Sequence, residues 1–165
     1  MIEPDAVDAI LAQWHRERPD LDVSPMGIIG RMARLAKHLE RAVQAKYTEF
    51  DLNIGEFDVL AALRRSGHPY QLSPTALFNT LMITSGTMTH RIDRLEQAGL
   101  VARIADPNDR RGTLVTLTEK GFDLIEQAVA AHVENERRIL SVLTSTEQEA
   151  LTQLLRKLLA SFEAK

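Results

Sequence analysis

The chain contains no cysteine, and only 5% of its 165 residues are aromatic. The absence of thiols excludes disulfides, cysteine nucleophiles, cysteine-based zinc sites and thiol redox sensing within this sequence. The longest stretch without a charged residue, 66–90, is rich in Ser, Thr, Gly and Pro, so it lacks the composition of a membrane span. Residues 1–19 lack the basic start and apolar run of a secretory signal. These features predict a soluble, cytoplasmic, single-domain protein with no membrane partner.

The net charge of −3 is unevenly distributed along the chain. Residues 1–22 carry −4, residues 23–118 carry +3, and residues 119–165 carry −2. A run of charge by itself usually marks only a solvated face. The basic middle segment is nevertheless compatible with a nucleic-acid partner, provided that its arginines fall on one face.

Hydrophobic spacing and capping residues predict a mainly α-helical fold. An amphipathic helix is expected over about 4–17, opened by Pro4. A long helix should run from Ser24 and Pro25, a cap followed by a proline in the first turn, to about Thr48. A further helix fits residues 55–65. Two more helices are expected to begin near Thr118 and Ser145.

The last helix carries an apolar stripe that is wide for the end of a small domain. Its members are Leu151, Leu154, Leu155, Leu158, Leu159 and Phe162. Packing on the protein's own core could account for part of this stripe, and a partner subunit explains the rest. We therefore predict that residues 1–48 and 119–165 form the dimerisation lobe of a homodimer, within a single domain spanning residues 1–165.

The middle of the chain predicts a helix-turn-helix. Short helices are expected over 73–81 and 84–98, where Ser73 precedes a proline as a cap. Gly99 can adopt the left-handed conformation that ends a helix, with Leu100 packing back on the last turn. The second helix is amphipathic and polar at its start, which is typical of a helix that binds DNA.

After Leu100 the hydrophobic period changes from that of a helix to that of a strand. Residues 101–106 and 113–118 fit strands, and the turn residues 107–112 lie between them. A hairpin directly after a helix-turn-helix is a wing. Residues 55–118 are therefore predicted to form a winged helix-turn-helix lobe that binds DNA.

The chemistry of both parts suits DNA. Hydroxyl groups and helix N-terminal amides of residues 84–91 can bind phosphate, and side chains of this helix can reach base edges. Two arginines at the tip of the hairpin can enter the minor groove, where negative potential is concentrated. The predicted DNA-binding residues are Ser73, Thr75, Thr84, Ser85, Thr87, Thr89, His90, Arg91, Arg94, Arg110 and Arg111. Taken alone, the polar start of the helix could be an ordinary cap, and the arginines of the hairpin could belong to a solvated turn. The combination of the two favours DNA binding. Met88 either contacts a thymine methyl group or faces the core.

Two segments resemble a known family. Residues 106–121, Asp-Pro-Asn-Asp-Arg-Arg-Gly-Thr-Leu-Val-Thr-Leu-Thr-Glu-Lys-Gly, resemble the wing of the MarR family of bacterial transcriptional regulators. Residues 84–100 resemble that family's recognition helix. The resemblance covers nearly the whole chain and implies a homodimer that reads a palindromic operator. Its half-sites would lie one helical turn, roughly 34–36 Å, apart.

The N-terminal segment is similar to a branch of that family that responds to urate. The similarity is carried by residues 13–19, Gln-Trp-His-Arg-Glu-Arg-Pro, and by the Ser-Pro-Met at 24–26. It implies an effector site made of Trp14, Asp58, Arg91 and Arg103. A planar purine anion could stack on the indole and accept hydrogen bonds from both arginines. The effector implied is urate or a related purine-like anion, with no cofactor and no metal.

Each of these four residues has a structural alternative. Trp14 could be a packing anchor, and Asp58 could be paired with a basic neighbour such as Arg91. Arg103 could be a solvated strand residue, and Arg91 could serve DNA alone. Since Arg91 lies on the recognition helix, the combination predicts that ligand and DNA compete for its position.

Other classes of function are less consistent with the sequence. An enzyme is disfavoured, because the five histidines are scattered and no HExxH, phosphate-binding loop, dinucleotide-binding or nucleophile-elbow pattern is present. No closely spaced ligand pair suggests a zinc site. Two alternatives stay open: a winged-helix module that binds protein instead of DNA, and a MarR-type regulator that senses a phenol or an aromatic carboxylate.

Overall fold

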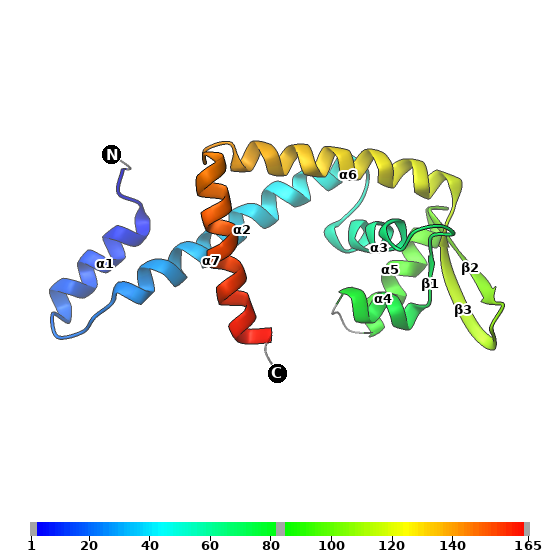
Figure 1. Cartoon of the computed structure of the whole chain (residues 1–165), viewed down its shortest axis with the longest axis horizontal. Coiled ribbons are helices and arrows are strands. Elements are labelled where there is room, and N and C mark those ends of the chain that lie inside the picture. The colour runs from blue at the N-terminus through cyan, green and yellow to red at the C-terminus, as the bar shows by residue number, and fades with distance from the viewer. Residues whose placement is uncertain (1–2, 82–84, 164–165) are drawn as a thin grey trace. The chain divides into compact units, whose positions relative to one another are not determined.

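The computed structural model describes residues 3–81 and 85–163 (Figure 1). Within these residues the elements are α1 Ala6–Glu17, α2 Ser24–Thr48, α3 Ile54–Arg65, β1 Gln71–Leu72, α4 Pro74–Leu81, α5 Ser85–Gln97, β2 Val101–Asp106, β3 Asp109–Leu117, α6 Glu119–Leu140 and α7 Ser145–Glu163. The fold is mainly helical with a small antiparallel sheet, which confirms the predicted class. The chain divides into two compact units, Met1–Ala45 and Lys46–Lys165.

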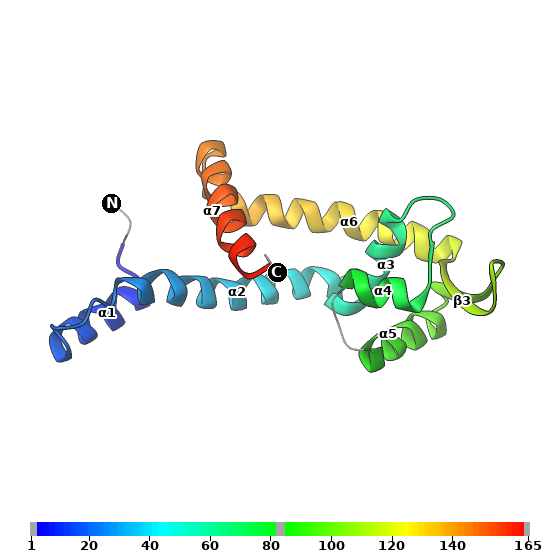
Figure 2. The same cartoon turned by 60° about the horizontal axis from the view of Figure 1, so that its bottom comes forward.

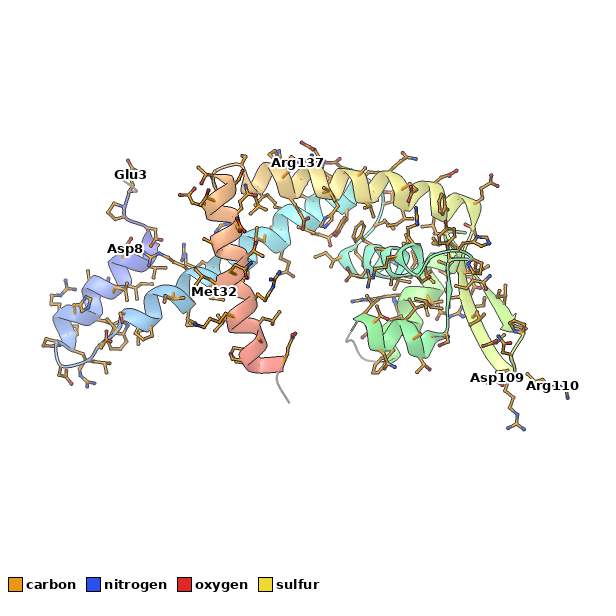
Figure 3. All side chains as sticks on the ribbon, in the orientation of Figure 1. Glu3, Asp8, Met32, Asp109, Arg110 and Arg137 are labelled. Carbon is orange, nitrogen blue, oxygen red and sulfur yellow. The ribbon has the colours of Figure 1, made fainter. Side chains whose placement is uncertain are left out.

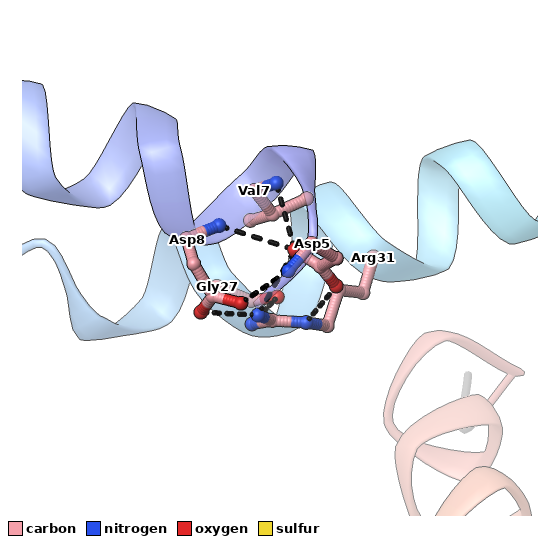
Figure 4. A network of polar contacts seen from close by, with 5 residues as sticks. All are labelled: Asp5, Val7, Asp8, Gly27 and Arg31. Carbon is pink, nitrogen blue, oxygen red and sulfur yellow. Dashed lines mark hydrogen bonds and ion pairs between the residues drawn. The ribbon is translucent and has the colours of Figure 1, made fainter. Parts of the chain in front are cut away.

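In the first unit, α1 begins with a reciprocal cap. The Asp5 carboxylate accepts hydrogen bonds from the backbone N–H groups of Val7 and Asp8, and the Asp8 carboxylate accepts one from the Asp5 N–H. Arg31 of α2 donates to Asp5 Oδ2 at 2.8 Å, to Asp8 Oδ1 at 2.6 Å and to the Gly27 carbonyl at 3.2 Å (Figure 4). The helix therefore starts after its Asp5 cap and not at the proline that the sequence favoured, and one arginine ties α1 to α2.

Each unit has an apolar helix face that the described residues leave exposed. On α1, α2 and their connector it comprises Ile10, Trp14, Leu21, Met26, Ile28, Ile29, Met32, Leu35 and Leu39. On α7 it comprises Leu151, Leu154, Leu155, Leu158, Leu159 and Phe162. Exposed apolar surfaces of this extent mark contacts with another protein. The predicted stripe on the last helix is thus present and uncovered.

The core of the second unit is built around α3. Three of its side chains, Val59, Leu60 and Leu63, have no solvent exposure. They are joined by buried side chains of the surrounding elements: Leu77 of α4, Ile92 and Leu95 of α5, Val101 of β2, Val115 of β3 and Ile125 of α6. In Figure 2, α3, α4 and α5 form the three-helix cluster expected of a helix-turn-helix and its supporting helix. Ser73 caps α4 as predicted, because its hydroxyl accepts from the Ala76 N–H at 3.1 Å.

The sheet contains one strand that the sequence did not predict. Its order is β1-β3-β2, all antiparallel, and β1 pairs Gln71 with Thr116 and Leu72 with Val115. A strand of two residues has no periodicity to detect, and it exists only because β3 passes beside it. The pairing attaches the segment before the helix-turn-helix to the base of the wing.

The wing differs in detail from its prediction. The strand β3 begins at Asp109 instead of at residue 113, so the turn consists of Pro107 and Asn108 alone. The Asp106 carboxylate accepts from the Asn108 N–H at 2.8 Å, which stabilises this short turn. Between the pairs Asp106–Asp109 and Ala105–Thr113, residues 110–112 form a bulge. Arg110 and Arg111 therefore lie in a bulge of β3 beside the turn, and not on the turn itself.

The wing leaves and rejoins the helical part at one point. Gly99, with φ of +69°, ends α5, and the Leu100 carbonyl accepts from the Thr118 N–H at 3.1 Å. The Thr118 hydroxyl donates to the Gly99 carbonyl at 2.8 Å. Lys120 Nζ donates to the carbonyl of Ala98, the residue before Gly99, at 2.8 Å. A Cβ on Gly121 would lie 1.9 Å from the Leu100 oxygen, so only glycine fits there. These contacts fix the end of α5 to the start of α6.

Candidate DNA-binding and effector site

The exposed face of α5 carries the polar residues predicted to read DNA. Thr87, Thr89 and His90 are exposed, whereas Met88 is 2% exposed and therefore belongs to the core. Met88 is followed by Ile92 and Leu95 on the same buried face, at the spacing of an amphipathic helix. Of the other predicted residues in this region, Thr84 lies outside the described residues and only the backbone of Ser85 is described.

The wing exposes both of its predicted arginines. Arg110 and Arg111 are exposed on β3, and Figure 3 shows Arg110 extending from the end of the hairpin. The Asp109 carboxylate accepts from the Arg111 N–H at 2.9 Å, which fixes the backbone of the bulge. The backbone that carries the two exposed arginines is accordingly fixed within the bulge. On α4, Thr75 is exposed as well, one residue after the proline that opens the helix.

The second half of α5 is held by ion pairs to neighbouring elements. Arg94 Nε forms an ion pair with Glu56 Oε1 of α3 at 2.9 Å, and the Glu56 side chain is only 5% exposed. Arg103 of β2 is bound to both Asp93 and Glu96, and its backbone N–H donates to Glu96 Oε1 at 3.1 Å. Hydrogen bonding to Asp93, reinforced by Glu96, raises the pKa of Arg103. The arginine predicted to bind a ligand is thus bound to two carboxylates of the recognition helix.

Asp58 and Arg91 are brought together in the second unit. Burial raises the pKa of Asp58 above its usual value, and the positive charges of Arg91, Arg65 and His132 oppose that rise. The Arg91 guanidinium lies directly over the backbone of α3, where a Cβ on Gly55 would be 2.2 Å from its Nε. Its Nη1 is buried without a hydrogen-bond partner among the described residues. A buried guanidinium N–H without a partner is unfavourable and can donate to an incoming acceptor.

A hollow of about 400 Å³ adjoins this arginine. Its lining residues are Asn53, Glu56, Thr87, His90, Arg91 and Arg94. The hollow thus lies between the start of α3 and the polar face of α5. Trp14, the remaining predicted ligand residue, is 40% exposed on α1 in the first unit.

Two groups of functional interest were missed by reasoning from the sequence. Glu56 is the first; the Asn-x-x-Glu pattern at 53–56 signals a capping box, but nothing in it signals an ion pair to Arg94. The second is the Tyr47 hydroxyl, which lies 3.0 Å from His132 Nδ1. The Tyr47 ring stacks on Phe57 with centroids 4.1 Å apart, and its burial raises the pKa of the phenol. No spacing along the chain connects residues so far apart.

The structure contains neither a candidate metal site nor a helix that could cross a membrane in the part of the chain that it describes. The helix-turn-helix, the exposed polar face of α5 and the arginine-bearing wing define a winged-helix protein of the kind that binds DNA.

Comparison with known proteins identifies the family. A model described as the MarR family matches residues 52–113. The chain is 47% identical over 149 residues to the HTH-type transcriptional regulator PecS of Dickeya dadantii (strain 3937), which covers 90% of each protein. This chain belongs to the MarR family of DNA-binding transcriptional regulators, whose members respond to ligands and are not enzymes.

Two solved structures extend the comparison. A cysteine-to-serine mutant of MarR from E. coli, complexed with operator DNA, has a TM-score of 0.69 at 30% identity, over 83% of this chain and 95% of that one. BpsR of Bordetella bronchiseptica, whose DNA binding is regulated by 6-hydroxynicotinic acid, has a TM-score of 0.67 at 31% identity, over 79% of this chain and 91% of that one. Proteins of this family bind operator DNA as dimers, and operator DNA and a second copy of the chain are therefore partners of this protein.

Proposed function

We propose that the protein represses transcription by binding a palindromic operator through α5 and the wing of each subunit. The contacts are assigned to Ser73, Thr75, Thr84, Ser85, Thr87, Thr89, His90, Arg91, Arg94, Arg110 and Arg111. The observation that carries this proposal is that α5 exposes Thr87, Thr89 and His90 while the bulge in β3 exposes two arginines. Hydroxyls and amides at the helix would bind phosphates and base edges, and the wing arginines would enter the minor groove.

Salt dependence tests the operator-binding role. An operator duplex selected from random-sequence DNA should bind the dimer with an affinity that falls steeply and linearly on a log–log plot against salt concentration, because phosphate contacts release counterions. Selection should yield two half-sites about one helical turn apart. A protein that selects no sequence, or whose affinity does not change with salt, would be a protein-interaction module instead.

We further propose that a small anionic aromatic ligand, urate or a related purine, releases the protein from DNA. The proposed site comprises Trp14, Asp58, Arg91 and Arg103. The supporting observation is the state of Arg91, which belongs to the recognition helix, faces the charge of Asp58 and has a buried N–H without a hydrogen-bond partner among the described residues. A ligand anion would supply the missing acceptor.

The contacts of Arg103 indicate how such a ligand would act on α5. Arg103 is bound to Asp93 and Glu96, so an anion that recruits Arg103 must compete with both carboxylates. Competition of this kind would weaken two of the ion pairs that position α5. Ligand and operator would then favour different positions of α5, and each would weaken binding of the other by the same factor.

Fluorescence of Trp14, the only tryptophan, tests the ligand proposal. Titration with urate, xanthine or hypoxanthine should quench the emission, and the same ligand should release the operator over the same concentration range. A saturating quench without release would assign the ligand a different role. Flat titrations by a folded dimer would refute the purine proposal.

A second ligand class is supported by one comparison. BpsR, 31% identical to this chain, is regulated by 6-hydroxynicotinic acid, an aromatic carboxylate. Because a carboxylate can also accept from Arg91 and Arg103 and stack on an indole, we include phenolic and aromatic carboxylates such as 6-hydroxynicotinate and salicylate in the same titration. Operator release by one of these, and not by a purine, would favour this second class.

A further inference from the structure

Glu56 is a buried carboxylate with two partners on different helices. It lies in the first turn of α3 and is 4% exposed. Its Oε2 accepts from the Asn53 N–H at 2.9 Å, which completes the capping box of α3. Its Oε1 forms an ion pair with Arg94 Nε at 2.9 Å. The same side chain thus caps α3 and holds an arginine of the recognition helix.

The ion pair is asymmetric in its exposure. The side chain of Glu56 is 5% exposed and that of Arg94 is 55% exposed, so one end of the pair is fixed in the core while the other faces solvent. An ion pair in which Nε is the nearest nitrogen leaves the two terminal amino groups of the guanidinium able to donate elsewhere. The carboxylate therefore sets the direction in which Arg94 presents its remaining donors.

A second arginine contacts the same turn of α3. Arg91, one helical turn before Arg94, lies over Gly55, the residue next to Glu56. Thr87 and His90 line the same hollow as these arginines. The first turn of α3 is therefore the surface on which the polar face of α5 is placed.

We infer that Glu56 is a positioning residue for operator binding: it holds Arg94 with its terminal amino groups directed away from the core, toward a phosphate of the operator. This inference rests on the operator-binding role proposed above for Arg94. It also predicts that removing the Glu56 carboxylate changes operator affinity in the direction opposite to that expected from its negative charge alone. Removing a carboxylate near DNA should strengthen binding by reducing repulsion, whereas removing a positioning carboxylate should weaken it.

Two substitutions of Glu56 separate its roles. Glu56→Asp keeps the charge, and aspartate at the same position of α1 completes a capping box through Asp8. The shorter side chain would no longer reach Arg94. Glu56→Gln keeps the length but replaces one carboxylate oxygen with an NH2 donor, and since Asn53 and Arg94 lie at different oxygens, one of them loses its acceptor. Arg94→Gln and the double variant Glu56→Asp/Arg94→Gln complete a cycle, and Asp123→Asn removes an exposed carboxylate of α6 as the control.

The experiment measures the affinity of each folded dimer for the selected operator duplex over a series of salt concentrations. Arg94→Gln should weaken binding by about tenfold and lower the log–log salt slope by about two per dimer, one phosphate contact for each half-site. Glu56→Asp and Glu56→Gln should lower operator affinity and salt slope by the same amounts. The double variant should bind the operator no more weakly than Arg94→Gln. The control should retain the affinity and slope of the wild-type protein.

The possible failures are distinguishable. If Arg94→Gln leaves affinity and slope unchanged, the proposed role of Arg94 is wrong and the inference fails with it. If Arg94→Gln weakens binding but both Glu56 variants bind as wild type, only the positioning role is refuted, and lower stability to urea would show that Glu56 acts as a cap alone. Tighter binding by Glu56→Gln would show that its charge merely repels DNA.

Discussion

Gly55→Ala tests whether the close approach of Arg91 to α3 is required. A Cβ at position 55 would lie 2.2 Å from Nε, 2.3 Å from Cζ and 2.6 Å from Nη2 of Arg91, and a Cβ does not approach the atoms of a distant residue within 3.0 Å. The guanidinium must therefore move. Because Arg91 is half-buried and its Nη1 is enclosed, the guanidinium can move only by giving up this enclosed position for the adjoining hollow.

Two effects of known size oppose each other in this variant. Alanine is favoured over glycine within a helix by about 0.5–1 kcal/mol. Overpacking of a filled site is unfavourable by about 1–3 kcal/mol. We expect overpacking to win, with a net loss of about 1–2 kcal/mol in the free energy of unfolding. In an Arg91→Ala background the obstructing guanidinium is gone, so the same substitution should instead stabilise the protein by about 0.5 kcal/mol.

Urea unfolding of the four proteins, at one fixed protein concentration because dimerisation contributes to stability, measures this change of sign. The coupling free energy between positions 55 and 91 should exceed about 1 kcal/mol. If Gly55→Ala stabilises the protein equally in both backgrounds, Arg91 does not lie over α3, and the geometry assigned to the site is wrong.

Three further predictions concern the wing, the ligand and a buried charge. Arg110→Ala should lower operator affinity by about 1–3 kcal/mol and leave the ligand response intact, whereas Arg137→Ala, on α6, should change neither in the same gel-shift titration. Trp14→Phe should blunt ligand-induced release and leave basal operator binding near normal, whereas Arg103→Ala should blunt release and also weaken operator binding, because it removes two ion pairs that position α5; wild-type release by either variant would overturn the site assignment. Burial raises the pKa of Asp58 in the folded state above its pKa in the unfolded chain. The folded state therefore loses stability as pH rises through this raised pKa and the group ionises. Asp58→Asn should therefore be more stable than wild type at pH 7 in urea unfolding, and the difference should shrink toward pH 4; equal stability at both pH values would contradict the raised pKa.

The sequence was sufficient to predict the elements that depend on local signals. The cap at Ser73, the left-handed turn at Gly99 and the change of period after Leu100 each act within a few residues, and each is confirmed in the structure. The burial of Met88 could not be decided in advance, since either orientation suits a helix that packs on one side. The wing was predicted correctly as a hairpin but with too long a turn, because the sequence does not show that an Asp106 side chain alone stabilises a two-residue reversal.

The parts that could not be predicted depend on contacts between distant segments. The strand β1 exists only through its pairing with Thr116 and Val115. The ion pair between Arg94 and Glu56 and the two ion pairs from Arg103 to α5 join elements whose separation is set by the whole core. The family resemblance selected Asp58 and Arg91 together, and the structure places their charges close enough to interact, but the sequence contained no signal that Arg91 crosses over Gly55.

The hydrogen bond between Thr118 and Leu100 joins the two ends of the hairpin, so the hairpin can change in length without altering the helices on either side. Its two ends meet through the bond from the Thr118 N–H to the Leu100 carbonyl, so residues can be added or removed near Pro107 without changing the spacing between α5 and α6. Related regulators can thus lengthen, shorten or recharge this loop to suit different promoters while the reading helix stays anchored. Grafting a foreign loop between Asp106 and Thr113 is accordingly a practical route to regulators with new DNA preferences.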